Sequence, residues 1–319
     1  MNKKNILIFG LSIILFISIF NLNSYCEENK KVISLSGAWA LYPMAVRWAE
    51  EYKKINPDIK IDISAGGAGK GISDALSNIV DIGMVSRDIN EEEIKKGALA
   101  IAVTKDAVVA TVNAKNPFIK EILSKGMKRE NFKDIFLTTK IQNWNDIYKT
   151  PKLKKTPKIN VFTRSDACGA AETWAKYFGA KQENLKGIGI FGDPGIAGAV
   201  IKDVLSIGYN NIGFAFDNKT KKMIKGLKVV PIDINENGKI DAEENFYDDI
   251  SKIVNAIAKG VYPSPPARNL FFVSNGKPKS QIVKDFIKWV LSDGQKFVFE
   301  AGYINLNKDT LNKQIELIK

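Results

Sequence analysis

Hydrophobic and polar positions along the chain alternate between two periods. Short apolar runs at residues 32–35, 59–63 and 82–85 have the length and pattern of strands. Between them, residues 42–55 place Ala45, Val46, Trp48, Ala49 and Tyr52 at helical spacing, and residues 72–79 form a second predicted helix. Strands that alternate with helices predict an α/β fold with a mostly parallel sheet and helices on both faces.

The same alternation continues to the C-terminal end. We expect strands at residues 98–103, 108–112, 159–162, 207–209, 213–216, 229–234 and 270–273, the first two separated by Thr104, Lys105 and Asp106. Further helices are expected at residues 170–178, 195–203, 281–291 and 295–301. Residues 113–117 and the proline cluster at 262–266 are the candidate boundaries, so the chain would cross twice between two lobes, one of residues 31–106 and 264–319 and one of residues 107–263.

The N-terminal segment reads as a targeting signal. Lys3 and Lys4 precede a continuous apolar run at residues 6–20, which is shorter than the ~20 residues of a membrane-spanning helix. We expect residues 1–26 to be a signal peptide and the protein to be exported, to the periplasm or the outer face of the cytoplasmic membrane. An uncleaved anchor is the alternative. Cys26 leaves open both lipidation and cleavage after the cysteine, because Tyr25 is larger than the residue that usually precedes a lipidated cysteine.

The amino-acid composition excludes several classes of catalytic site and binding partner. The 319 residues contain no histidine and only two cysteines, which excludes Ser-His-Asp and Cys-His catalysis and gives no basis for a disulfide framework. The net charge is +12, which favours encounters with anions. The lysines are scattered without interleaved aromatic residues, so no nucleic-acid partner is expected.

Three glycine-containing loops follow predicted strands and open predicted helices, at residues 36–40, 66–71 and 164–170. The first turn of a helix has unpaired N–H groups and the positive end of the helix dipole, and glycine lets the backbone approach an anion. Arg164 could grip an oxyanion through two parallel N–H bonds, with Asp166 orienting it or accepting a proton from the anion. Arg87 is a second candidate cation. An ordinary Arg–Asp surface pair and a solvated arginine are the alternative interpretations.

The order of these motifs resembles the phosphate-binding proteins of ABC phosphate importers over residues 31–306. Residues 36–48 resemble the family's S-G-S-T-T-L-x-P opening, residues 66–72 its G-G-x-G-x-G-I turn, residues 81–87 its D-I-G-M-x-S-R segment, and residues 164–170 its R-S-D-x-S-G-T loop. The resemblance implies a two-lobed type II periplasmic-binding fold, with each lobe a mixed sheet flanked by helices, that captures phosphate by hinge closure without catalysis and as a monomer. It also implies ligand-binding roles for Ala38, Trp39, Ala40, Ala68, Gly69, Lys70, Ser86, Arg87, Arg164, Asp166, Cys168, Gly169 and Ala170.

Several of these positions depart from the family pattern. Trp39 and Ala40 replace threonines, Ala68 replaces a serine, Cys168 and Ala170 replace Ser and Thr, and Ser86 stands where some members have an aspartate. Each lost hydrogen bond to a charged ligand costs about 1.5–3 kcal/mol. The sequence therefore leaves open a different oxyanion or small organic anion, an enzyme acting on phosphate esters, and an envelope structural protein.

A separate motif predicts a structural calcium ion. Residues 233–244 fit the twelve-residue EF-hand loop, with glycine at position 6 and oxygen donors at positions 1, 3, 5, 7, 9 and 12. The expected ligands are Asp233, Asn235, Asn237, Lys239 through its carbonyl, Asp241 and Glu244. An Asx-rich turn without a metal is the alternative.

Overall fold

The computed structural model describes residues 31–149, 157–217 and 219–319. The predicted signal peptide, with Cys26, lies outside the described residues. The strands are β1 (Val32–Gly37), β2 (Lys60–Ala65), β3 (Ile82–Val85), β4 (Ala98–Asn113), β5 (Asn160–Arg164), β6 (Ile188–Ile190), β7 (Ser206–Asn211), β8 (Leu227–Val229) and β9 (Ala267–Asn275). The helices are α2 (Tyr42–Ile55), α3 (Ala68–Leu76), α4 (Glu91–Lys95), α5 (Ile119–Lys125), α6 (Arg129–Phe136), α7 (Gly169–Tyr177), α8 (Gly192–Lys202), α9 (Ile250–Ala258), α10 (Gln281–Leu291) and α11 (Lys308–Leu317).

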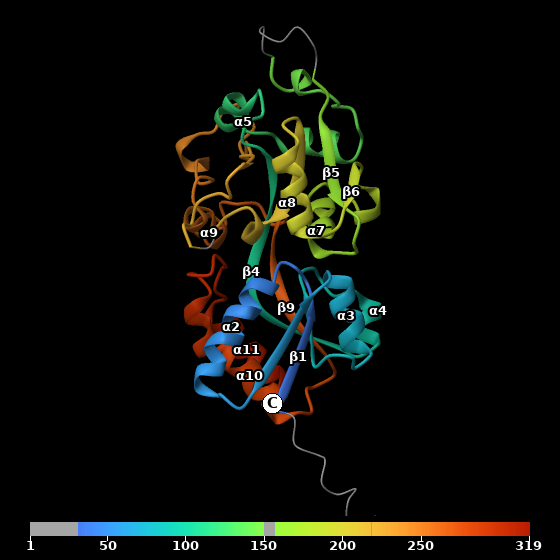
Figure 1. The fold of residues 1–319 in the computed structure, drawn as a ribbon, viewed down its shortest axis with the longest axis vertical. Helices are drawn as coiled ribbons and strands as arrows, with labels where there is room; N and C mark the ends of the chain where they lie inside the picture. The colour runs from blue at the N-terminus through green and yellow to red at the C-terminus, as the bar shows by residue number, and fades with distance from the viewer. Residues whose placement is uncertain (1–30, 150–156, 218) are drawn as a thin grey trace, which may run out of the picture.

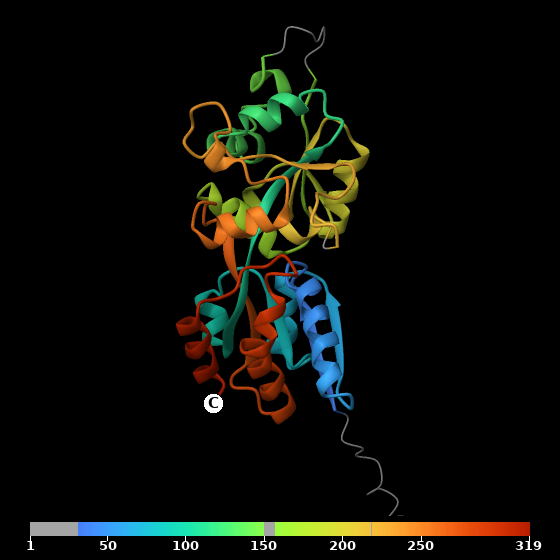
Figure 2. The same cartoon turned by 90° about the vertical axis from the view of Figure 1, so that its left-hand side faces the viewer.

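The chain forms two α/β lobes joined by β4 and β9, which run antiparallel through the waist of the molecule (Figures 1 and 2). In the first lobe β1 pairs in parallel with β2 and β3, and β3 pairs antiparallel with β9. In the second lobe β4 pairs antiparallel with β7 and β8, whereas β5 pairs in parallel with β7 and β6. This arrangement confirms the predicted two-lobed fold with a mixed sheet in each lobe, and it is less parallel than the residue pattern alone suggested.

Each lobe has its own hydrophobic core. Trp48, Phe272 and Phe286 are among the largest fully buried side chains of the first core, and Trp144 and Trp174 of the second. Along β4 the membership of these cores changes between Val103 and Ala107, and along β9 between Ala267 and Leu270. The predicted lobe boundaries stay a prediction, but a bend at this level of β4 and β9 would move one core relative to the other without breaking either.

Helix α2 shows why the residue pattern gives this fold. Pro43 lies at its first turn, where a missing N–H costs nothing, and Met44, Trp48 and Tyr52 recur every fourth residue on the buried face. The predicted bounds of α2, β3 and α10 agree with the structure. No helix within the described residues has both the length and the hydrophobicity that crossing a bilayer requires.

One predicted break in a strand is wrong. Residues 98–103 and 108–112 belong to a single strand, β4, with a register shift against β9 between Ala102 and Thr104. Two of the three intervening residues are buried and paired, since Thr104 Oγ1 donates to the carbonyl of Ile304 at 2.9 Å and Asp106 accepts from Arg268 at 2.9 Å, whereas Lys105 is exposed. Polar side chains with such partners do not end a strand.

Three further predictions fail for residues with weak local signals. Residues 212–214 form a 3-10 turn instead of a strand, and β8 ends at Val229. The predicted helix at residues 295–301 is a 3-10 segment over Asp293–Phe297. Helix α11 was not predicted, because none of its residues is fully buried and it carries only a weak apolar stripe.

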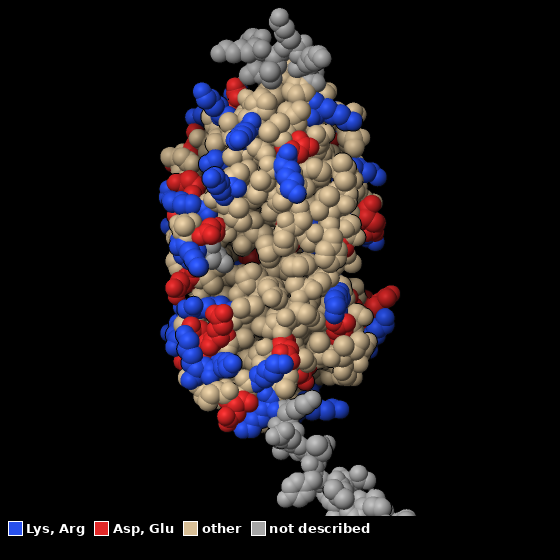
Figure 3. All heavy atoms as spheres, viewed as in Figure 1, with Lys and Arg blue, Asp and Glu red and all other residues tan. Residues whose placement is uncertain are grey.

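Charged side chains of both signs are interspersed on the face shown in Figure 3. A mixed surface of this kind produces no large field of one sign. On this face, therefore, surface charge alone does not select an anion, and selectivity has to come from particular side chains.

Candidate functional site

Two of the three predicted glycine loops meet across the boundary between the lobes. The N–H of Gly69, in the first turn of α3, donates to the carbonyl of Ala167 in the opposite lobe at 3.2 Å. A Cβ built on Gly67 would lie 2.8 Å from the same carbonyl and 3.1 Å from Oδ2 of Asp166. The structure thus brings the start of α3 and the loop that opens α7 together, with the lobes closed on each other.

The first loop contributes Trp39 to the same boundary. Ala38 and Ala40 are buried in the core of the first lobe, and the N–H of Ala38 donates to Met84 at 2.8 Å. The Trp39 ring reaches the second lobe, where it contacts Phe191 and Phe214 edge to face at 6.1 and 6.3 Å between ring centroids. Its indole Nε1 is buried and has no hydrogen-bond partner within the described residues. A buried donor without an acceptor is costly, so this edge of the ring is suited to meeting an acceptor supplied by a ligand.

Arg164 is the last residue of β5, and its side chain has no exposed surface. Nε and Nη2 donate to the two carboxylate oxygens of Asp166 at 2.7 and 2.6 Å, and Nη1 donates to Oδ2 of Asp193 at 2.6 Å. The main-chain N–H of Arg164 donates to the hydroxyl of Tyr209 at 3.1 Å, which fixes the end of the strand. These ion pairs use three of the five N–H donors of the guanidinium, and one donor remains on each terminal nitrogen.

Asp193 is a residue of the candidate site that the sequence analysis missed. It lies in the first turn of α8 and is fully buried. Oδ1 accepts the main-chain N–H of Asn211, and Oδ2 accepts the side-chain amide of Asn211, both at 2.7 Å. The run Gly192, Asp193, Pro194, Gly195 marks a helix start, but no local signal indicates that its carboxylate meets an arginine from another strand.

Arg164 and the carboxylates of Asp166 and Asp193 stabilise each other's charge in an environment that is buried from water. Burial opposes the charge of the guanidinium, but Asp193 and Asp166 raise the pKa of Arg164 above its usual range, so it stays a cation. Burial also raises the pKa of the Cys168 thiol to about 12, although Arg164 opposes this shift. Cys168 is therefore a neutral thiol at physiological pH, and its Sγ accepts the N–H of Ala171 at the start of α7.

The remaining positions of the third loop pack against Ser86 of the first lobe. A Cβ built on Gly169 would lie 2.1 Å from the carbonyl oxygen of Ser86, so only glycine allows this approach. Ala68, Ser86 and Ala170 are all buried. Arg268 of β9 donates to the carbonyl of Gly169 and to Thr173 Oγ1, and it pairs with Asp106. The start of α7 is thereby attached to the strand that joins the lobes.

Two predicted cations are paired with carboxylates of their own lobe. Lys70 pairs with Asp74 one turn further along α3, and Asp74 also accepts from Ser36 Oγ at 2.7 Å. Arg87 forms two hydrogen bonds with Glu93, at 2.7 and 2.9 Å, and its mostly buried side chain lines the cavity between the lobes. A ligand role for Lys70 and Arg87 stays a prediction, and neither one is a free cation in the closed arrangement.

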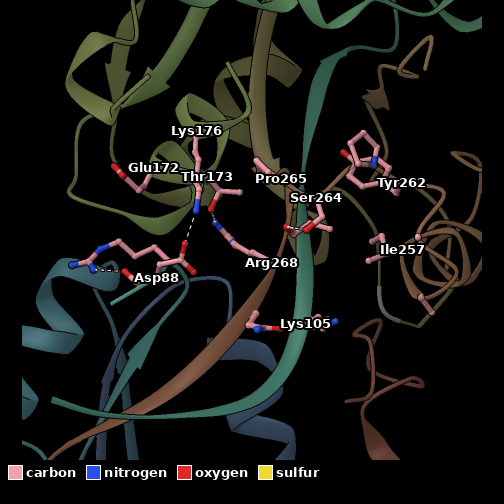
Figure 4. A pocket seen from close by; sticks show the side chains of 16 residues that line it. Asp88, Lys105, Glu172, Thr173, Lys176, Ile257, Tyr262, Ser264, Pro265 and Arg268 are labelled. Carbon is pink, nitrogen blue, oxygen red and sulfur yellow. Dashed lines mark hydrogen bonds and ion pairs between the residues drawn. The ribbon is translucent and has the colours of Figure 1, made fainter. Parts of the chain in front are cut away.

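A cavity of about 720 Å³ lies beside the hinge, between the lobes (Figure 4). Arg268, Lys105 and Lys176 line it together with Asp88 and Glu172. Lys176 of α7 reaches across to Asp88 at 2.5 Å, an ion pair that joins the lobes. Arg164 does not line this cavity. The chemistry predicted for the loops therefore lies in the closed contact between the lobes, next to this open space.

The six predicted calcium ligands lie elsewhere, in one loop of the second lobe between β8 and α9. Asp233 and Glu244 are buried, whereas the intervening Asn235, Asn237, Lys239 and Asp241 are more exposed. This loop contributes nothing to the contact between the lobes, so the two predicted sites are separate.

The chain is similar to several known proteins. It is 29% identical to the phosphate-binding protein PstS of Methanocaldococcus jannaschii over 90% of this chain and 86% of the relative. It is 27% identical to PstS of Borreliella burgdorferi over 96% and 99%. Among solved structures, a protein from Clostridium perfringens, assigned as a phosphate ABC transporter substrate-binding protein and crystallised with bound phosphate, superposes with a TM-score of 0.69 at 23% identity over 86% of this chain and all of that chain.

An ABC-type phosphate transport receptor from Vibrio cholerae superposes with a TM-score of 0.61 at 20% identity, over 86% of this chain and all of the receptor. At these identities the structural likenesses concern the fold. Together the matches confirm the resemblance that the order of the motifs predicted. The family model described as PBP superfamily domain matches residues 26–294, which is most of the chain. The chain therefore belongs to the PBP superfamily.

Proposed function

We propose that this protein captures a small oxyanion, in the first place phosphate, between its two lobes and delivers it to the permease of an ABC importer. The observation that carries the proposal is the placement of Arg164. Its buried guanidinium lies where the starts of α3 and α7 meet, and it retains two N–H donors after its ion pairs with Asp166 and Asp193. The relatives named PstS and the phosphate-bound structure from Clostridium perfringens support the same ligand.

The carboxylates beside Arg164 favour an anion that carries a proton. Asp166 and Asp193 together outnumber the single guanidinium, so a fully deprotonated anion would meet net negative charge. An anion with an O–H group can instead donate a hydrogen bond to Asp166. Phosphate is protonated at neutral pH and sulfate is not, so this site is expected to prefer phosphate over sulfate.

The absence of side-chain hydroxyls from the three loops determines how strongly the site binds phosphate. Ala38, Ala40, Ala68 and Ala170 provide no side-chain donor, and Cys168 provides only a thiol. The indole N–H of Trp39 and the backbone N–H groups at the helix starts are the remaining donors beside Arg164. We expect weaker phosphate binding than a hydroxyl-lined site gives. A larger oxyanion or a small organic anion is the second candidate, favoured by the substitution of a small threonine by Trp39.

Capture requires the lobes to open, because the helix starts contact each other in the closed arrangement. The connections at the waist, β4 and β9, are the natural hinge, and bending there would separate Gly69 from Ala167 and Lys176 from Asp88. Closure around the anion would then present one surface made of both lobes to the permease. No bond is made or broken in this cycle, so no enzymatic step is proposed.

The place of action follows from this role. We propose an exported protein that works outside the cytoplasmic membrane as a monomer, with residues 1–26 as its signal and Cys26 as a candidate lipid anchor. The relatives named PstS support this location. Mass spectrometry of the protein purified from membranes would show whether Cys26 carries a diacylglycerol.

Thermal unfolding in the presence of candidate anions tests the proposal. A ligand that binds only the folded protein raises Tm in proportion to the logarithm of its concentration over Kd. Phosphate should raise Tm, sulfate should raise it less, and acetate should have no effect. If a small organic anion raises Tm and phosphate does not, the second candidate replaces the first. Release of product from p-nitrophenyl phosphate would instead indicate a phosphate-ester enzyme.

A further inference from the structure

We infer that the loop from Asp233 to Glu244 binds one Ca²⁺ ion, and that this ion ties together the outer end of the second lobe. The loop follows β8 and leads to α9, with Glu244 in a short 3-10 turn over Ala242–Glu244. Its sequence places oxygen donors at the spacing of a calcium loop. The inference rests on two independent observations, the sequence pattern and one unpaired buried carboxylate oxygen.

The unpaired oxygen belongs to Asp233. The residue is only 2% exposed, and its Oδ1 has no hydrogen-bond partner within the described residues. Its other oxygen, Oδ2, accepts the N–H of Gly238 at 2.8 Å, so the carboxylate lies inside the turn of the loop. A buried carboxylate oxygen without a partner is strongly unfavourable unless a cation or a donor meets it. A metal ion in the loop would supply that cation.

The rest of the loop presents oxygen atoms toward the same turn. Gly238 adopts φ +86°, a conformation that a residue with a Cβ rarely takes, and this reverses the chain direction at the sixth position. Asn235 Oδ1 and Asn237 Oδ1 accept the N–H groups of Asn237 and Lys239, each at 3.1 Å. The amide oxygens are thereby held inside the turn, as hard ligands of the kind that Ca²⁺ takes.

The carboxylate of Asp241 already has a cationic partner. Lys239 Nζ lies 2.7 Å from Oδ1, and Oδ2 accepts from the side-chain amides of Asn235 and Asn237. The exposed ammonium of Lys239 is the cation at this oxygen, and it would move into solvent when Ca²⁺ binds.

The inferred site does not consist of carboxylates alone. No group of three or more His, Cys, Asp or Glu side chains in the part of the chain that the structure describes is gathered closely enough to hold a metal. Glu244 receives N–H bonds from Ile234, Asn235 and Asp241 at 2.8 to 3.2 Å. The inferred coordination therefore relies on the amide oxygens and the Lys239 carbonyl together with Asp233 and Asp241, which is a donor set suited to calcium and to no softer metal.

Binding at this loop would strengthen a region remote from the contact between the lobes. The N–H of Ile240 donates to the backbone carbonyl of Ser124 in α5 at 2.8 Å. The N–H of Asp233 donates to the backbone carbonyl of Met127 at 3.0 Å. Helix α5 lies at the end of the second lobe that points away from the first (Figure 1). An ion in the loop would thus fix the connection between α5 and α6 to the segment that follows β8, without touching Arg164.

Calcium titration of the whole protein tests the inference. Isothermal titration calorimetry with CaCl₂ in phosphate-free buffer should give one site per chain, with MgCl₂ binding much more weakly. At about 10 mM CaCl₂, ten times a Kd of about 10⁻³ M, Tm should rise by about 2 °C relative to EDTA. No heat of binding and an equal Tm in CaCl₂ and EDTA would overturn the inference without the need for any variant.

Asp233→Asn is the sharpest variant, because the amide oxygen can still accept from Gly238 while the unpaired carboxylate oxygen is replaced. It should remove the calcium-induced rise in Tm, and in EDTA it should unfold at the same temperature as the wild type or higher. Asp248→Asn is the matched control, since Asp248 lies just beyond the loop and forms an exposed pair with Lys252 at 3.0 Å. A calcium response that survives in Asp233→Asn, or disappears in Asp248→Asn, would contradict the inferred site. Phosphate binding should not change in either variant, so the inference and the proposed function fail separately.

Discussion

Arg164 Nη1 donates a hydrogen bond to Oδ2 of Asp193 at 2.6 Å, and neither side chain has any exposed surface. The pair joins the end of β5 to the start of α8. Because Asp193 also accepts two bonds from Asn211 of β7, it fixes the guanidinium relative to three elements of the second lobe. The direction in which Arg164 presents its two remaining N–H donors is set by this relationship.

Breaking the ion pair between Arg164 and Asp193 should strongly destabilise the folded protein. Asp193→Asn removes one buried charge and turns an amide toward the guanidinium, and we expect the free energy of unfolding in urea to fall by about 3–5 kcal/mol. Asp88→Asn is the matched control, because Asp88 also forms an ion pair but its side chain is 76% exposed. The control should lose no more than about 1 kcal/mol. Equal losses in the two variants would show that the Arg164–Asp193 pair has no special structural role.

The indole N–H of Trp39 is expected to bind the anion. Trp39→Phe keeps the aromatic contacts but removes the donor, and a hydrogen bond to a charged group of about 1.5–3 kcal/mol corresponds to a roughly 10- to 150-fold weaker phosphate affinity by calorimetry. Trp174→Phe is a close control. Trp174 Nε1 is also buried without a partner, but it lies in the core of the second lobe. A loss of affinity in both variants, or in neither, would exclude Trp39 as a specific ligand.

Restoring the hydroxyls should strengthen phosphate binding. Cys168→Ser and Ala170→Thr each place a hydroxyl at the start of α7, in the loop that follows Arg164. Each new bond to the anion is expected to improve Kd by about 10-fold or more in an equilibrium dialysis experiment. Ala180→Ser, which adds a hydroxyl just beyond α7 and away from its start, is the control. Unchanged affinity in the first two variants would mean that phosphate does not lie at the start of α7.

The buried thiol predicts a dependence of stability on pH. The pKa of Cys168 rises from 9.0 to about 12 on folding, mainly through burial. A raised pKa in the folded state gives stability that is fully present below pH 9 and is lost as pH rises through the range from 9 to 12. Serine does not titrate in this range, so the stability of wild type relative to Cys168→Ser should fall by about 2 kcal/mol between about pH 8 and about pH 10.5. Urea unfolding at the two pH values measures the change. A constant difference would mean that the thiol ionises equally in both states.

The parts of the fold that could be predicted have strong local signals. Helix α2 has a full apolar stripe and a proline in its first turn, and β3 is a short apolar run between turns. The three loops could be placed at one site because each follows a strand and opens a helix, and the structure brings residues 67–69 and 166–169 into contact. Such signals lie within a few residues of one another, so they are visible in the sequence.

The parts that could not be predicted depend on partners distant in sequence. Asp193 is 29 residues from Arg164, and Arg268 is 99 residues from Gly169, so neither contact has a local signature. The same reason explains the continuous strand β4, where Asp106 is satisfied by Arg268 from 162 residues away. The pairing of Lys70 with Asp74 and of Arg87 with Glu93 is local, but it competes with the ligand role that was predicted for these cations.

The most direct test of the central claim is a crystal structure of the protein after incubation with phosphate, compared with one prepared without phosphate. The proposed function predicts a tetrahedral anion between the lobes, within hydrogen-bonding distance of Arg164 Nη1 and Nη2 and of Trp39 Nε1. A cleft that holds no anion after incubation at millimolar phosphate, or an anion bound away from Arg164, would contradict it.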